Sequence, residues 1–326
     1  MTKDYILHIF SNIIFSKGEK RSLLLDLQHN KFYFAPNSME AFAKGCEGKT
    51  KTEIFASFSE EEHPIVEEYI DFLQKNMIAA FLPKEAIKNF TAISKKYESP
   101  YLFENVILDV DSNFDYKIIY KLDEISIPYI QIRFYNKIDY QLLQIIEELS
   151  FVSVEIVVRF GEFDKSALEK YKKVAYLYVY QSPVEEQKKE NNKTYYFKNN
   201  QTFECIGKVT KHTFSINAPH VFLSLQYNSC LYKKLYIGTN GEIRNCPATE
   251  KFGNILDLTV EEVCQLSLDK HFTQMWHITK DQIEECKDCE FRYICTDCRC
   301  FITDKSNIYS KPKNCKYNPY AAEWKE

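Results

Sequence analysis

The stretch CKDCEFRYICTDCRC, residues 286–300, places five cysteines within fifteen residues. The 326-residue chain holds only six others, and the first 204 residues contain just one of them, Cys46. Thiolates are soft ligands that suit iron–sulfur clusters and zinc. An odd total of eleven cysteines fits disulfide pairing poorly, and clustered cysteines in a cytosolic chain are more often metal ligands than disulfides. The stretch therefore predicts a metal centre near the end of the chain.

Composition and charge limit the class of protein. A length of 326 residues with 45% hydrophobic content predicts two or three domains with real cores. The net charge is −4 and no basic stripe stands out, which argues against a nucleic-acid protein. The N-terminus has no basic-then-apolar leader, and no apolar run approaches the roughly 20 residues that cross a bilayer. We therefore expect a cytoplasmic protein without nucleic-acid or membrane partners.

The cysteines of this stretch belong to a longer spacing pattern. Upstream, Cys230 and Cys246 bracket Gly241, with four residues between Gly241 and Cys246. The stretch itself reads CxxC, five residues, then CxxC, and one more cysteine follows downstream. The seven are Cys230, Cys246, Cys286, Cys289, Cys295, Cys298 and Cys315. Seven ordered thiols exceed the four ligands of one structural zinc site. Iron–sulfur clusters are therefore favoured, and zinc is the alternative.

This pattern resembles the SPASM domain, the auxiliary-cluster module at the C-terminal end of many radical-SAM peptide-modifying enzymes. CKDCEFRYICTDCR, with KPKNCKYNPYAAEW after it, is similar to SPASM-type maturases of the grasp-with-spasm systems. Those proteins act beside an ATP-grasp ligase on ribosomally synthesised, post-translationally modified peptides. The likeness extends more weakly to RSLLLDLQHNKFYFAPNSMEAF and YNSCLYKKLYIGTNGEIRNCPA. It implies two [4Fe–4S] clusters, with a precursor peptide and an ATP-grasp ligase as partners.

The resemblance also divides the ligands between the two clusters. One cluster would use Cys286, Cys289, Cys295 and Cys315, and the other would use Cys230, Cys246 and Cys298. This chain has two residues before Cys298 where the usual pattern has three, so Cys300 is the alternative ligand at that position. The second cluster needs a fourth ligand, for which Cys205 is the candidate. Otherwise its iron is open or takes His212, His220, water or substrate.

One motif that the resemblance leads us to expect is missing. A radical-SAM enzyme needs CxxxCxxC just after the first barrel strand, which here is NVILDV, residues 105–110. No cysteine lies between Cys46 and Cys205. We therefore expect no SAM-cleaving cluster and no bound SAM. The motifs GxxxxGK[ST], GxGxxG, HExxH and GxSxG are also absent, so the ATP chemistry would belong to a separate ligase and the catalytic residues stay unknown.

Residues 1–97 predict a winged-helix unit. A hairpin is expected over residues 20–35, followed by helices that begin near Ser38, Thr50 and Glu60 and a closing strand over 77–83. The third helix is acidic, which argues against DNA. The resemblance implies that the leader of a precursor peptide adds a strand to the hairpin edge. That edge is offered by Lys31, Phe32, Tyr33 and Phe34, unless these aromatics only form the core of the unit.

Two further regions follow. In residues 98–225, strands over 105–110, 129–135, 154–160 and 175–181 alternate with helical patterns, which predicts a parallel sheet. Four such units are too few for an eight-unit barrel, so we expect an α/β fold with a degenerate, partial TIM-type barrel. The polar run 185–194 is expected to be an exposed loop. Residues 226–326 would form the cysteine-rich SPASM iron–sulfur domain, with a hairpin at Asn240-Gly241 and a helix capped by Thr259.

Three hypotheses follow from these observations. The first is an iron–sulfur protein for peptide maturation that binds the precursor leader and acts with an ATP-grasp ligase. The second is an enzyme that uses an open-site auxiliary [4Fe–4S] cluster on the peptide. The third is a zinc-stapled interaction protein.

Overall fold

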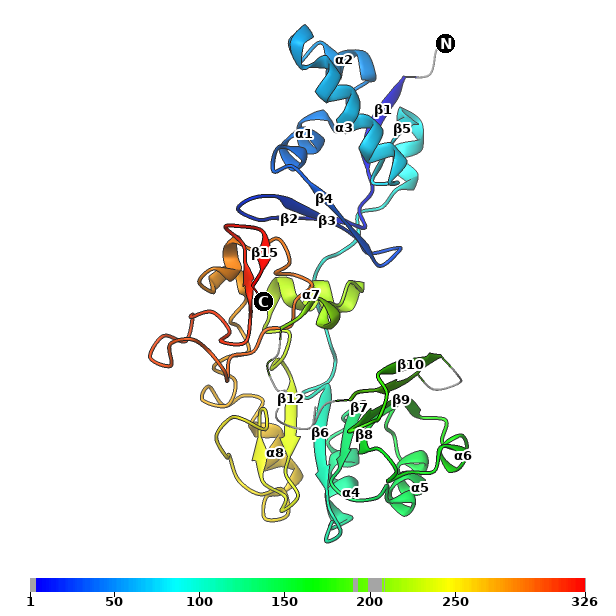
Figure 1. Cartoon of the computed structure of the whole chain (residues 1–326), viewed down its shortest axis with the longest axis vertical. Coiled ribbons are helices and arrows are strands. Elements are labelled where there is room, and N and C mark those ends of the chain that lie inside the picture. The colour runs from blue at the N-terminus through cyan, green and yellow to red at the C-terminus, as the bar shows by residue number, and fades with distance from the viewer. Residues whose placement is uncertain (1–3, 190–192, 199–206, 208, 326) are drawn as a thin grey trace.

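The computed structural model describes residues 4–189, 193–198, 207 and 209–325. The molecule is elongated, with an N-terminal unit (residues 4–89) at one end and a parallel sheet at the other (Figure 1). Cysteine-rich chain from the C-terminal end lies between them on one side. Residues far apart in sequence therefore meet in the middle of the molecule.

The N-terminal unit contains two small sheets and three helices. Its three-stranded antiparallel sheet is formed by β2 (Ile13–Lys17), β3 (Ser22–Asp26) and β4 (Lys31–Ala35). β1 (Tyr5–Ile9) pairs with β5 (Ala79–Pro83), and the helices are α1 (Ser38–Cys46), α2 (Lys51–Phe55) and α3 (His63–Lys75). Short 3-10 turns occupy Glu60–Glu62 and Lys84–Asn89. The expected hairpin, three helices and closing strand are confirmed, and the Thr50–Glu53 capping box begins α2. β1 and β2 were not expected.

Strand β3 is buried along its whole length, which explains its apolar run SLLLD. Leu24 faces the helices, where it packs with residues of α1 and α3. Leu23 and Leu25 face the opposite way and pack with Phe291 and Tyr317 of the cysteine-rich chain. A strand covered on both faces shows continuous rather than alternating hydrophobicity. The N-terminal sheet is thus the middle layer between its own helices and the C-terminal end.

The central sheet is mixed, with a parallel core. Its strand order is β10-β11-β9-β8-β7-β6-β12-β13, and the pairs from β11 through β12 are parallel. The strands are β6 (Asn105–Val110), β7 (Tyr129–Phe134), β8 (Ser153–Arg159), β9 (Val174–Tyr180), β10 (Glu186–Lys189), β11 (Lys193–Tyr196), β12 (Lys234–Ile237) and β13 (Ile243–Arg244). The connecting helices are α4 (Lys117–Glu124), α5 (Tyr140–Glu148) and α6 (Lys165–Leu168). The four expected strands are confirmed, and the sheet is open.

The expectation of an exposed loop over 185–194 was wrong. Residues 186–189 form β10, and β11 begins at residue 193 and pairs with both β10 and β9. The Tyr195 ring stacks on Tyr178 of β9 with centroids 5.3 Å apart. Pairing with a neighbouring strand therefore makes this polar segment an edge of the sheet, although its composition is typical of a loop.

The remaining elements surround the cysteines. α7 (Ala218–Gln226) precedes the β12–β13 hairpin, whose turn holds Gly241 at φ 81°. β12 pairs with β6, so this hairpin extends the parallel sheet. α8 (Val260–Gln265) begins with the expected Thr259–Glu262 capping box. A 3-10 turn at Lys211–Thr213 precedes α7. Most of the chain after α8 is irregular, with 3-10 turns at Lys280–Gln282 and Cys286–Asp288 and the short strands β14 (Tyr317–Asn318) and β15 (Glu323–Trp324). No described helix is long and apolar enough to cross a membrane.

Candidate metal centre

The first group of thiols, here called the loop group, consists of Cys286, Cys289, Cys295 and Cys315. Cys286 opens a 3-10 turn that Cys289 closes, and the Cys289 N–H donates to the Cys286 carbonyl at 3.0 Å. Cys286 is near enough to Cys295 and Cys315 for their charges to raise its pKa. Charges on Cys286 and Cys295 likewise raise the pKa of Cys289. The backbone of Cys315 forms an isolated parallel β-bridge with Val209. The structure therefore brings together the four cysteines expected to hold one cluster.

The second group, here called the hairpin group, consists of Cys230, Cys246, Cys298 and Cys300. The β12–β13 hairpin carries Cys230 before its first strand and Cys246 after its second. Cys230 lies within electrostatic range of Cys246 and Cys298. The thiol of Cys300 is within hydrogen-bond reach of both the Cys246 and the Cys298 sulfur atoms. The three cysteines expected for the other cluster thus meet, together with Cys300.

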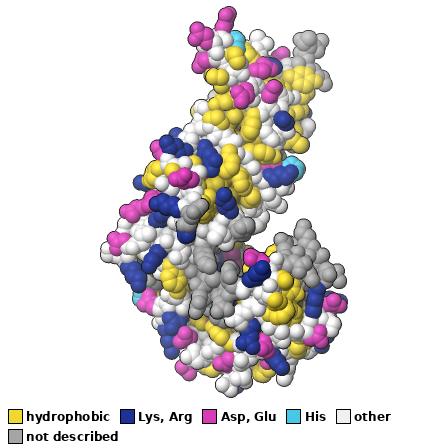
Figure 2. Space-filling model, viewed as in Figure 1, with side chains coloured by type: hydrophobic (Ala, Val, Ile, Leu, Met, Phe, Trp, Pro, Cys, Tyr) yellow, Lys and Arg dark blue, Asp and Glu magenta, His cyan; other side chains and the backbone are white. Residues whose placement is uncertain are grey.

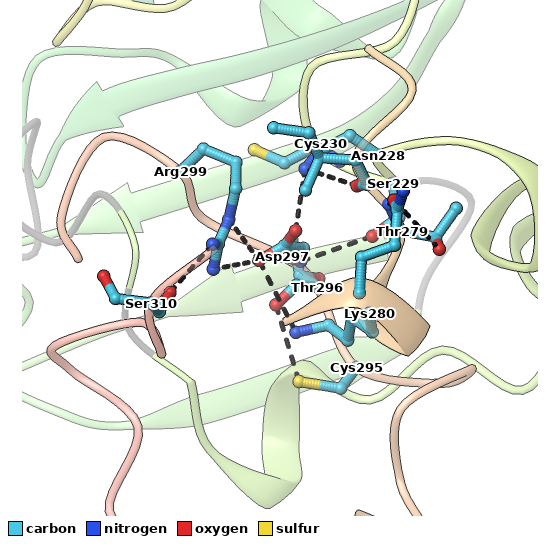
Figure 3. Close-up of polar contacts among 12 residues, drawn as sticks. Asn228, Ser229, Cys230, Thr279, Lys280, Cys295, Thr296, Asp297, Arg299 and Ser310 are labelled. Atoms are coloured by element: carbon cyan, nitrogen blue, oxygen red, sulfur yellow. Dashed lines mark hydrogen bonds and ion pairs between the residues drawn. The ribbon is translucent and has the colours of Figure 1, made fainter. Parts of the chain in front are cut away.

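A buried carboxylate, Asp297, lies between the two groups (Figure 3). It accepts hydrogen bonds from the Asn228 amide at 2.8 Å and from Arg299 Nε at 2.9 Å. Lys280 Nζ lies 3.7 Å away and is also buried. Asn228 in turn accepts the Cys230 backbone N–H at 3.0 Å. Asp297 therefore ties the hairpin cysteines to the loop that carries Cys295, because buried charges are stable only when paired.

Burial controls the charge of most of these thiols. It raises the pKa of Cys230 to about 11 and that of Cys286 to about 12, and it also raises the pKa values of Cys289 and Cys295. Without metal, these side chains are therefore neutral thiols at pH 7. Metal binding would displace their protons, because the thiolate is the ligand. The hairpin group behaves differently, since hydrogen bonds from Cys300 lower the pKa of Cys246 and of Cys298 against the effect of burial.

Both groups consist of thiols, which suit iron–sulfur clusters and zinc alike. Among the described His, Cys, Asp and Glu side chains, no three are placed as ligands around one ion. A structural zinc takes four ligands at about 2.3 Å from a single ion, whereas a [4Fe–4S] cluster takes one thiolate per iron. The four thiols of each group match the number of ligands that either centre takes.

The other candidate ligands lie elsewhere or are not described. Cys205 and the His212 side chain fall outside the described residues. His220 is in the first turn of α7, where burial and the charge of Lys280 lower its pKa to about 4. Lys280 also acts on Cys286 and Cys295, so His220 lies on the side of the loop group rather than the hairpin group. Cys264 lies in α8 and packs against the core of the central sheet.

The expected peptide-binding residues lie on β4, an edge strand that pairs only with β3 among the described strands. Tyr33 faces the helices, and its ring lies 6.3 Å from Phe72 of α3. Phe32 and Phe34 face the opposite way, with ring centroids 6.2 and 5.9 Å from Phe291. Lys31 is exposed. The aromatics are thus packing residues, while the outer backbone edge of β4 has no strand beside it among the described residues.

Phe291 stands between Cys289 and Cys295, so the cysteine loop touches the N-terminal sheet directly. Arg21 bonds to Glu290 at 2.8 Å, and the Glu19 N–H donates to the Asp288 carbonyl at 2.8 Å. A Cβ on Gly18 would come within 2.8 Å of the Glu290 nitrogen, so the β2–β3 turn and the cysteine loop approach as closely as glycine allows. The candidate peptide-binding sheet and one candidate metal site therefore share an interface.

Hydrophobic side chains gather on the visible face of the N-terminal unit and at its junction with the rest of the molecule (Figure 2). The large exposed apolar residues within residues 4–93 are Tyr5, Phe34, Ile65, Met77, Phe90 and Ile93. Grouped exposed apolar residues are typical of surfaces that bind another chain.

A pocket of about 520 Å³ lies where β6, β7 and β12 end. Ligands of parallel sheets bind at these carboxyl ends. Here Asp109 accepts hydrogen bonds from Arg133, from the Tyr135 hydroxyl at 2.9 Å and from the Tyr236 hydroxyl at 2.7 Å. The described lining holds no cysteine. A carboxylate paired with Arg133, Tyr135 and Tyr236 thus stands at the carboxyl ends of these strands.

Sequence reasoning missed Asn228, Lys280, Asp297 and Arg299 as supports of the cysteine loops. The available signal was the placement of Asp297 and Arg299 on either side of Cys298, because charged residues within a buried cysteine loop require buried partners. Their partners come from residues up to 69 positions away, as with Asn228 and Asp297. Spacing along the chain does not identify such partners.

Comparisons with known proteins add only distant likeness. No protein-family model and no curated protein matches this chain. Among solved structures, the chain is similar to Streptococcus suis SuiB, in crystals described as SuiB, as SuiB bound to S-adenosylmethionine and as SuiB bound to its precursor peptide SuiA. In that order, the identities are 13%, 12% and 10% and the TM-scores are 0.40, 0.37 and 0.30. The alignments cover 90–94% of this chain and 96–99% of SuiB. TM-scores below 0.5 are too low to carry an argument about shared fold or chemistry.

Proposed function

We propose that this chain is an iron–sulfur protein that takes part in the maturation of a ribosomally synthesised peptide. It binds the leader of the precursor at its N-terminal unit and acts with an ATP-grasp ligase. The observation that carries the proposal is the presence of two groups of four cysteines joined by one buried carboxylate. When bound, two [4Fe–4S] clusters would supply covalent cross-links for the irregular C-terminal chain and a route for electrons.

The loop group and the surrounding chain support the cluster assignment. Residues 277–325 contain little regular structure, so this segment has few backbone ladders to stabilise it. A metal centre stabilises such a segment by binding only its folded form. The loop ligands are Cys286, Cys289, Cys295 and Cys315, and the hairpin ligands include Cys230, Cys246 and Cys298. Cys205 remains the ligand expected from the resemblance.

The open edge of β4 supports the leader-binding proposal. A peptide strand that pairs with Lys31 to Phe34 gains main-chain hydrogen bonds, and side-chain pockets provide the choice of sequence. The three-region division at residues 97 and 225 and the cytoplasmic location belong to the same proposal.

The absence of CxxxCxxC from the sequence supports a maturation role without SAM cleavage. The ligase partnership rests on the resemblance of CKDCEFRYICTDCR and KPKNCKYNPYAAEW to grasp-with-spasm maturases. Copurification of the full chain with an ATP-grasp ligase from the same cells tests the partnership, and separate elution of the two proteins would count against it.

Metal analysis after anaerobic purification tests the cluster proposal. We expect approximately eight irons and eight acid-labile sulfides per chain, the number for two four-iron clusters. Approximately one or two zinc ions per chain without sulfide would overturn the proposal in favour of a zinc-stapled interaction protein.

Site-specific photocrosslinking tests leader binding in the full chain. Benzoylphenylalanine replaces Phe34, which is 43% exposed beside the open edge, or Phe160, which is equally accessible at 44% but follows β8. We expect a leader-bearing precursor peptide from the same cells to crosslink at position 34 and not at position 160. Equal crosslinking at both positions, or none at position 34, would refute the assignment of β4 as the docking edge.

A further inference from the structure

We propose that Cys300 is the fourth ligand of the hairpin group, together with Cys230, Cys246 and Cys298. This inference rests on the proposed function, because it assumes that the group holds a four-iron cluster. It replaces Cys205, the open iron and the non-thiol ligands with a residue whose position the structure describes. It also makes both Cys298 and Cys300 ligands, where the sequence pattern treated them as alternatives.

The contacts of Cys300 carry the proposal. Its thiol lies within hydrogen-bond reach of two sulfur atoms of the group, Cys246 and Cys298. Cys230 completes the group, since it lies within electrostatic range of the same two sulfurs. Cys230 and Cys300 also pack, half-buried, against the core of the central sheet. The group therefore offers four thiols, the number that a [4Fe–4S] cluster takes.

The backbone around Cys300 is held in place independently of any metal. The Lys313 N–H donates to the Phe301 carbonyl at 2.8 Å, and the Thr303 N–H donates to the Lys311 carbonyl at 2.9 Å. On the other side of Cys300, the buried Arg299 donates to Asp297 and to the Ser310 carbonyl, both at 2.9 Å. Residues on both sides of Cys300 are thus tied down, so its approach to Cys246 and Cys298 is built into this part of the fold.

The inventory of thiols supports the same conclusion. Among the described cysteines, the loop group has four members, and the hairpin group has four only when Cys300 is counted. The two other described cysteines have no thiol of either group among the charged neighbours that shift their pKa values: Cys46 is buried among the N-terminal helices, and Cys264 lies in α8. With Cys300 bound, neither cluster has an open iron, and such clusters transfer electrons or stabilise the fold rather than bind substrate.

Three single variants of the full chain separate the candidate ligands. Cys300→Ala should lower the iron content below that of the wild type and remove or alter one of two reduced-cluster signals in electron paramagnetic resonance. Cys205→Ala and the control Cys264→Ala should keep both signals and the full iron content. Retention of all iron and both signals by Cys300→Ala, or their loss in Cys205→Ala, would overturn the inference. A wild-type chain that binds no iron would instead overturn the proposed function, which is a distinguishable result.

Discussion

Replacing Phe291 by Ala should loosen the N-terminal sheet, although the residue lies inside the C-terminal cysteine loop. The Phe291 side chain is only 4% exposed. Its ring lies 4.9 Å from Phe214 and 5.0 Å from Tyr317. On the sheet side it meets Phe32 and Phe34 of β4 at 6.2 and 5.9 Å. The substitution therefore removes the ring that connects the sheet to the loop.

The expected magnitude follows from the burial of this ring. Phe→Ala changes in a core cost about 3–5 kcal/mol through lost transfer energy and the cavity left behind. Because the ring is shared by two parts of the chain, we expect the opening free energy of β3 and β4 to fall by about 3 kcal/mol. That change corresponds to roughly 150-fold in the opening equilibrium, at 1.4 kcal/mol per factor of ten.

Hydrogen exchange followed by mass spectrometry measures this effect locally. Amides of residues 22–35 should exchange roughly 150-fold faster in Phe291→Ala, while amides of β6 to β8 should be unchanged. Phe160→Ala, at a position 44% exposed, is the control and should leave residues 22–35 unaffected. Unchanged exchange in residues 22–35, or equal acceleration in β6 to β8, would refute the idea of a local junction.

Three further predictions concern buried groups. Burial lowers the pKa of His220 to about 4 from an ordinary value of about 6.5. Between pH 6.5 and 4 the unfolded chain therefore binds a proton at His220 that the folded chain does not bind. The free energy of unfolding should fall by on the order of 3 kcal/mol as the pH drops through this window. In denaturation experiments, His220→Gln should show a flatter dependence of stability on pH, and parallel curves for the two proteins would contradict this. Asp109→Asn removes the negative charge that the buried Arg133 pairs with and should cost about 3–5 kcal/mol. Faster amide exchange in β6 and β7 would show this loss, and unchanged exchange would count against a stabilising ion pair. Gly18→Ala places a Cβ 2.8 Å from the Glu290 nitrogen and should cost about 1–3 kcal/mol of stability. Amide exchange in β2 and β3 should be faster, and exchange at the wild-type rate would show that the β2–β3 turn and the cysteine loop can move apart at no cost.

Much of the secondary structure could be predicted because the signals are local. β6 occupies the expected residues 105–110, since an apolar run between polar turns identifies a buried strand. The capping boxes at Thr50 and Thr259 were read from residues three apart and are present. β1 and β2 were missed because they are short and their partners are decided by tertiary contacts, as with β1 and β5, which lie some seventy residues apart.

The cysteine spacing predicted which thiols meet but not how the second set is completed. Cys300 stands next to the pattern, yet its approach to Cys246 depends on the pairing of residues 301–303 with 311–313. Likewise, the hydrogen bond from Asn228 to Asp297 depends on the fold of the hairpin. Long-range pairings of this kind leave no periodic signal in the chain.

The interface between the first sheet and the cysteine loop has a consequence for biosynthesis. Arg21 finds its partner Glu290 only after 269 further residues have been added. At about 5–20 residues per second, that interval is roughly 15 to 50 seconds. Until then the cysteine loop does not cover the face of the β2–β4 sheet that carries Ile14, Leu23 and Leu25. A chain whose synthesis ends before residue 286 therefore keeps an exposed apolar sheet, which is a target for chaperones and proteases.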